Sequence, residues 1–250
     1  MIRQILAAIA RPQQPPPWSV IYAALITIGA FAAVIIGTTI VTLFGDQSPF
    51  RVVLAWVIGL TLIALYVTLA RNRTPQDGEA LGLTQPLGRW PLIVLLSFGA
   101  GAALDLVSLL ATGTPAVIAE FMPLFNPAPL PFGGDAIPTW ILTGLLMVVF
   151  QPVAEGLVFR GVAYPALRTA LGPVQGFMIT ALWYGILHLV AYSTPGGADW
   201  VAWWYTLILP VLAGVYIGAV RAVTGSTRAS IFAHAGLGLF FLVRALTLVG

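Results

Sequence analysis

Long apolar stretches alternate with short polar or proline- and glycine-rich segments along the whole chain. A helix needs about 20 consecutive apolar residues to cross the hydrocarbon core of a membrane. Clusters of proline and glycine end helices, so they mark the connections between spans. The pattern predicts seven membrane-spanning helices. These cover approximately residues 18–44, 51–70, 90–111, 139–167, 174–192, 201–221 and 229–249.

The composition agrees with this pattern. Hydrophobic residues make up 59% of the chain and charged residues only 8%, whereas a soluble domain carries about 25% charged residues. The expected fold class is therefore an all-α, polytopic transmembrane helical bundle in a lipid bilayer. The net charge is only +3 and the arginines are scattered, so nothing indicates a nucleic-acid partner. Cysteine is absent, which excludes disulfides and thiol chemistry.

The chain divides into three predicted parts. Residues 1–17 form a short amphipathic lead that ends in a proline-rich spacer, and residues 18–138 hold the N-terminal transmembrane helices and loops. Residues 139–250 carry most of the candidate chemistry. Within the second part, the proline- and glycine-rich segment 112–138 could dip back into the membrane.

The placement of arginine predicts the orientation of the chain. Seven spans put eight of the eleven arginines in segments on the same side as the N-terminus, while Arg51 lies on the other side. Loops rich in arginine and lysine face the cytoplasm. A cytoplasmic N-terminus and an outside C-terminus are therefore expected.

Five ionisable residues of note fall inside predicted spans: Asp105, Glu155, Arg160, His188 and His234. Arg244 lies near the end of the last span. A charge at the centre of a membrane helix costs about 2.5–3.5 kcal/mol, so such residues mark functional sites by default. The two histidines are the only ones in the chain, and both lie in spans.

A carboxylate and two imidazoles in neighbouring spans could share one buried polar pocket. That set suits general-base activation of water, and Glu155, His188 and His234 could also hold a divalent metal such as zinc. A structural interpretation stays open for each. Glu155 and Arg160 could be an ion pair that locks two helices, and each histidine alone could be an interhelical hydrogen-bond donor.

The stretch AEGLVFRG, residues 154–161, resembles the first motif (EExxxR) of the CAAX-protease and bacteriocin-processing family, also called the CPBP or ABI family. Glu155 matches the first glutamate and Arg160 the arginine. The second motif, FxxxH, is matched by Tyr184 and His188, with tyrosine in place of phenylalanine. The third, HxxxN or HxxxD, is matched at His234, after a TGS run typical of the family. The resemblance covers roughly residues 139–240, and it implies that residues 139–250 form a catalytic core like that of the CPBP family.

The resemblance implies an intramembrane endopeptidase that cuts a peptide or a membrane-anchored protein. It assigns Glu155 the role of general base with His188 as its partner, and His234 the role of oxyanion stabiliser. Tyr184 is expected to orient His188. No cofactor is required in the glutamate and water interpretation, although a divalent metal such as zinc is an alternative.

Two positions depart from the family pattern. Gly156 stands where the second glutamate is expected, and Gly238 where the asparagine or aspartate is expected. These departures favour a second hypothesis, in which a catalytically weakened or inactive family member acts as a membrane binding or scaffold protein. A small transporter is a third hypothesis, but the chain shows no internal repeat of the kind that many transporters contain.

Arg160 needs a partner because Gly156 carries no carboxylate. Asp105 is the only other acidic residue inside a predicted span. We therefore hypothesise at this point that Asp105 supports Arg160.

Overall fold

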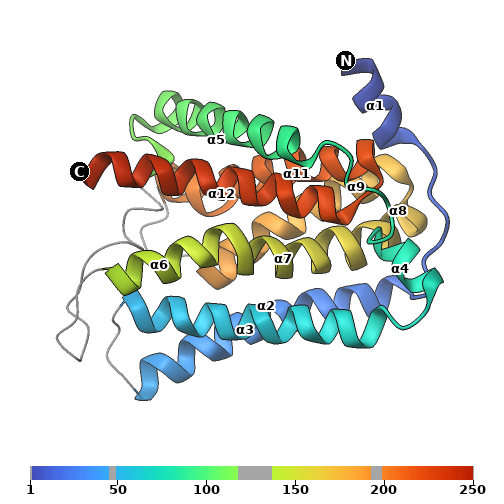
Figure 1. Ribbon diagram of the computed structural model, residues 1–250, viewed down its shortest axis with the longest axis horizontal. Helices are drawn as coiled ribbons and strands as arrows, with labels where there is room; N and C mark the ends of the chain where they lie inside the picture. The colour runs from blue at the N-terminus through green and yellow to red at the C-terminus, as the bar shows by residue number, and fades with distance from the viewer. Residues whose placement is uncertain (1, 45–48, 118–136, 193–198, 250) are drawn as a thin grey trace.

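The computed structural model describes residues 2–44, 49–117, 137–192 and 199–249 (Figure 1). Within these ranges the secondary structure is helical and no strand is formed. The α-helices are α1 (Ile2–Ala10), α2 (Val20–Phe44), α3 (Pro49–Arg71), α4 (Pro75–Leu81), α5 (Trp90–Thr112), α6 (Ile137–Leu145), α7 (Gln151–Glu155), α8 (Tyr164–Leu171), α9 (Pro173–Leu187), α10 (Trp200–Trp203), α11 (Leu209–Thr224) and α12 (Thr227–Val249). Four segments are π-helical: η3 (Leu146–Phe150), η4 (Gly156–Ala163), η5 (His188–Tyr192) and η6 (Trp204–Ile208).

Seven helices in the described ranges are long and apolar enough to cross a membrane, which confirms the predicted polytopic bundle. They run over Val20–Val41, Phe50–Arg71, Trp90–Thr112, Pro138–Leu171, Pro173–Ala191, Trp200–Thr224 and Thr227–Leu248. Large apolar side chains such as Leu95 and Leu110 lie exposed on the outside, as expected of a surface that faces lipid. Most of segment 112–138, which could dip into the membrane, lies outside the described residues. The orientation of the termini stays a prediction.

Helix α5 packs its small and polar face inward and its leucines outward. Its buried residues are Ser97, Gly101, Asp105 and Ser108, which recur at helical spacing. The partner is α12, which runs beside α5 in Figure 1. A Cβ atom at Gly101 would lie 2.8 Å from the Cβ of Phe240, so a larger residue there would separate the two helices. Small residues at such interfaces are the usual means of close packing between membrane helices.

Three of the four π-helical turns, η3, η4 and η6, lie next to prolines inside the spans. Proline has no N–H and its ring clashes with the carbonyl four residues earlier, which widens the helix locally into a π-turn. The carbonyl four residues before Pro152 lies in η3, the one before Pro165 in η4, and the one before Pro210 in η6. The span Pro138–Leu171 is therefore one continuous but irregular helix, and Glu155 lies directly before η4.

Candidate functional site

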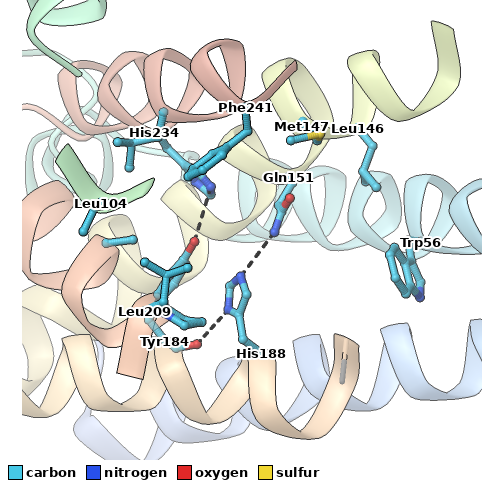
Figure 2. Close-up of a pocket in the computed structure, with 14 residues that line it drawn as sticks. Trp56, Leu104, Leu146, Met147, Gln151, Tyr184, His188, Leu209, His234 and Phe241 are labelled. Atoms are coloured by element: carbon cyan, nitrogen blue, oxygen red, sulfur yellow. Dashed lines mark hydrogen bonds between the residues drawn. The ribbon is translucent and has the colours of Figure 1, made fainter. Parts of the chain in front are cut away.

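A cavity of about 130 Å³ lies among α9, α11, α12 and the η3–α7 segment. Its polar lining residues are Gln151, Tyr184, His188 and His234, and the rest of the wall is apolar (Figure 2). A water molecule needs about 10–15 Å³ of such space, so the cavity has room for several. Two of the three predicted catalytic residues, His188 and His234, thus share one buried cavity.

His188 is held in one tautomer by the backbone of its own helix. Its Nδ1 lies 3.0 Å from the carbonyl oxygen of Tyr184, one turn earlier. A carbonyl oxygen can only accept, so Nδ1 carries the proton in the neutral ring and Nε2 is left as an acceptor. The ring of Tyr184 also packs against the imidazole, with the ring centroids 4.5 Å apart. Tyr184 therefore lies beside His188, and its role in orienting the imidazole stays a prediction.

Glu155 reaches the cavity through Gln151, a residue to which the sequence motifs assign no role. Gln151 lies one helical turn before Glu155, and its Nε2 donates to the carboxylate Oε1 over 3.1 Å. The same Nε2 lies 3.4 Å from His188 Nε2, as the dashed line in Figure 2 shows. Because both neighbours are acceptors, the two amide hydrogens of Gln151 are shared between them. One atom thus lies within reach of both Glu155 and His188.

His234 lies on α12, and its side chain contacts the same group of residues. Its Nε2 lies 3.3 Å from the hydroxyl of Tyr184, and the imidazole is buried. The side chains of Gln151, Tyr184, His188 and His234 converge in Figure 2, although they come from three separate spans. Glu155 is almost fully buried, with 2% of its surface exposed, and lies behind Gln151 rather than on the cavity wall.

Residues 137–240 match the family model of the type II CAAX prenyl endopeptidase Rce1-like proteins. The match covers 104 of the 250 residues, and this segment is similar to the Rce1-like family. The predicted family resemblance, which covered roughly residues 139–240, is thereby confirmed. No curated protein and no solved structure was found to match the chain. The match supports a protease-type activity and a membrane-associated substrate in coarse terms.

The two departures of this Rce1-like segment from the motifs both lie at close helix contacts. A Cβ atom at Gly238 would lie 2.2 Å from the backbone oxygen of Met147 in η3. A Cβ atom at Gly156 would lie 2.4 Å from Cγ1 of Ile231 on α12. Contacts this short cannot form, so in this packing neither position has room for a side chain. Gly238 lines the cavity, and the Met147 backbone lies where an asparagine side chain would begin.

The hypothesis that Asp105 supports Arg160 is wrong for this arrangement. Arg160 is almost fully buried and donates from Nη2 to the carbonyl oxygen of Gly214 over 2.8 Å. Its guanidinium carbon also lies 5.4 Å from the centroid of the Tyr184 ring. Asp105 instead accepts a hydrogen bond from the backbone N–H of Val117 over 3.0 Å. The pairing failed because the arginine donates instead to a backbone carbonyl, which no sequence pattern reveals.

We expect the Asp105→Asn variant to retain activity. Asparagine keeps an oxygen that can accept from the Val117 N–H, so the contact survives the loss of charge. Cleavage should stay within about threefold of wild type, because Asp105 is paired with no cation in the described part of the chain and the variant keeps its acceptor oxygen. Initial rates in proteoliposomes would check this, and a much larger loss would show that Arg160 depends on the Asp105 carboxylate.

The alternative of a metal held by Glu155, His188 and His234 was left open by the sequence. In the part of the chain that the structure describes, no group of three His, Cys, Asp or Glu side chains could share an ion. The Gln151 amide lies between the first two residues, and His234 is engaged with Tyr184. This arrangement does not fit a three-ligand zinc site, so no step below is routed through a metal.

Proposed function

We propose that the protein is an intramembrane endopeptidase that hydrolyses a peptide bond of a peptide or a membrane-anchored protein. The observation that carries the proposal is the position of the Gln151 Nε2 atom, 3.1 Å from a carboxylate oxygen of Glu155 and 3.4 Å from Nε2 of His188. A candidate base and its partner are thus aimed at one point beside a cavity. Such a base must lie within about 2.6–3.2 Å of the proton that it abstracts.

In the proposed reaction a water molecule takes the position of the Gln151 amide nitrogen. His188 Nε2 accepts one hydrogen of the water and orients it, while the Glu155 carboxylate takes the other proton. The water oxygen bonds to the carbon of the scissile carbonyl, whose oxygen becomes negative. His234 and the Tyr184 hydroxyl, which are in contact, supply hydrogen bonds to that oxygen. Glu155 then gives its proton to the nitrogen as the C–N bond breaks.

Gln151 must move before this water can enter. We therefore expect the Gln151→Ala variant to cleave at least as fast as wild type, within about threefold, because the change leaves Glu155 and His188 intact and opens the point between them to water. Single-turnover rates in proteoliposomes would measure this. Gln175→Ala, which removes an exposed glutamine on α9, is the matched control. A loss of more than about tenfold in Gln151→Ala alone would instead make the amide a required positioning group.

A second candidate function is binding without turnover, and the contact at Gly238 favours it. The backbone oxygen of Met147 lies only 2.2 Å from the position of a Cβ atom at residue 238. The amide that the third motif supplies to the oxyanion therefore has no place here. Loss of one oxyanion donor slows an enzyme about 10²–10³-fold. A membrane binding or scaffold protein would tolerate such a loss.

The two candidates are separated by assaying the purified protein in proteoliposomes. Two substrates should be offered, a farnesylated peptide with a CAAX-type C-terminus and a membrane-anchored peptide without a prenyl group. The protease proposal expects a fragment from at least one of them, identified by mass spectrometry. Saturable binding of the peptides without any fragment would favour the second candidate.

A further inference from the structure

A second cavity, of about 660 Å³, lies at one end of the bundle. It is bounded by α1 and the proline-rich spacer, by α4, and by the ends of α8 and α11, which lie at the right-hand end of Figure 1. Three arginines line it, Arg11, Arg168 and Arg221, against one carboxylate, Glu79. The cavity is therefore positively charged, and it is separate from the one that contains the histidines.

Arg168 and Arg221 are buried against the same aromatic ring. Their exposed fractions are 6% and 4%, and their guanidinium carbons lie 4.8 Å and 5.4 Å from the centroid of the Tyr164 ring. Their hydrogen-bond partners within the described ranges are all neutral oxygen atoms. Buried charges are normally paired with an opposite charge. Two neighbouring buried cations without a carboxylate partner indicate that an anion belongs between them.

Arg221 lines this cavity, and most of its donors are unused within the described part of the chain. Its Nε donates to the carbonyl oxygen of Arg160 over 3.3 Å, and its two Nη groups have no hydrogen-bond partner among the residues that the structure describes. Gly82, at φ +69°, makes room for the guanidinium, since a Cβ atom there would lie 2.5 Å from Nη2. Four N–H donors of a buried arginine therefore remain for a ligand.

Arg168 binds the N-terminal lead, which forms one wall of the cavity. Its Nη2 donates to the carbonyl oxygens of Ile9 and Arg11, at the end of α1. Its Nε has no partner in the described part of the chain. The exposed side chain of Arg11 lines the same cavity. The lead is thus held over the end of the bundle with its own arginine beside the other two.

We propose that this cavity binds the phosphate group of an anionic phospholipid headgroup. The guanidinium fork matches the oxygens of a phosphate in a bidentate manner. Arg168 and Arg221 each lie three residues before the end of a membrane span, at Leu171 and Thr224, which is the level of the headgroups. The exposed Ile2 and Leu6 of α1 (70% and 59%) suit a helix that lies in the interface.

The test uses the full-length protein, stripped of lipid in an uncharged detergent. Short-chain phosphatidylglycerol, short-chain phosphatidylcholine and inorganic phosphate are titrated separately, and the midpoint of thermal unfolding is followed. We expect saturable stabilisation by phosphatidylglycerol alone. Arg221→Gln and the exposed Arg11→Gln should each raise its apparent dissociation constant at least about tenfold, because each loses a charge-assisted contact. Arg73→Gln removes an exposed charge at the same end of the bundle but outside the cavity, and should leave binding unchanged.

Equal stabilisation by both lipids, or an equal loss of binding in Arg73→Gln, would overturn the proposal. Equal stabilisation by inorganic phosphate would assign the cavity to a soluble phosphate compound and overturn the lipid assignment. If Arg221→Gln does not fold, Arg11→Gln still decides the outcome, since its side chain is exposed and no described residue depends on it. The result is independent of proteolysis, because no substrate is cleaved in the assay.

Discussion

The Glu155→Gln variant should fold normally and cleave substrate about 10²–10⁴-fold more slowly than wild type, the range that a positioned general base contributes. Glutamine at 155 keeps an oxygen that can accept from Gln151 Nε2, so the 3.1 Å contact is preserved. What it loses is the ability to take a proton from water. Single-turnover cleavage in proteoliposomes measures the chemical step without interference from product release.

Asp77→Asn is the matched control for this change. Asp77 lies on α4, where its side chain accepts from the backbone N–H of Thr74, and asparagine can do the same. It is partly exposed and does not line the cavity of His188 and His234. Its rate should equal that of wild type. Undiminished cleavage by Glu155→Gln would remove the glutamate from the mechanism and leave the histidines as the only candidate bases.

The fold could be predicted because a membrane protein is surrounded by lipid, and lipid requires the residues that face it to be apolar. Each predicted span coincides with an observed one to within a few residues, since a helix must be apolar for as long as it faces lipid. The π-turns were not predicted, although Pro152, Pro165 and Pro210 are visible in the sequence. The α5–α12 contact was also missed, because a helix with outward leucines and inward serines reverses the pattern of soluble proteins.

The sequence could predict the candidate site only through residue types that are rare in this chain, above all histidine. Two histidines in two spans had to be explained, and the structure brings both to one cavity. Gln151 was missed because a neutral amide carries no sequence signal of its own. Its role depends on His188, which lies 37 residues further along the chain. Its one available signal was its position, an amide in an apolar run one helical turn before Glu155.

The glycines at the motif positions were interpreted from the sequence as lost chemical groups. The structure adds a packing reason, since Gly156 contacts α12 and Gly238 contacts η3. At Gly238 the close contact is with a backbone, which cannot move aside, whereas at Gly156 it is with the Ile231 side chain. Gly238 also lines the cavity, so the close approach of α12 and η3 sets part of its shape.

The free energy of unfolding of the Gly238→Ala variant should be about 3 kcal/mol lower than that of wild type. This loss is at the upper end of the usual cost of overpacking. Its new Cβ atom would lie 2.2 Å from the backbone oxygen and 2.9 Å from the carbonyl carbon of Met147. A backbone cannot rotate away as a side chain can, so α12 and η3 must separate. Thermal unfolding in detergent measures the loss, and Gly238→Asn, which restores the third motif, should be at least as unstable and no more active.

Gly99→Ala is the control because Gly99 lies in the middle of α5, where a Cβ atom would have no neighbouring atom within 4 Å. That variant should be as stable as wild type or more stable by up to about 1 kcal/mol, the difference in helix propensity between the two residues. A stable Gly238→Asn variant with faster cleavage would contradict the packing argument. It would mean that η3 and α12 lie further apart in the working enzyme, with an oxyanion site that the glycine leaves empty.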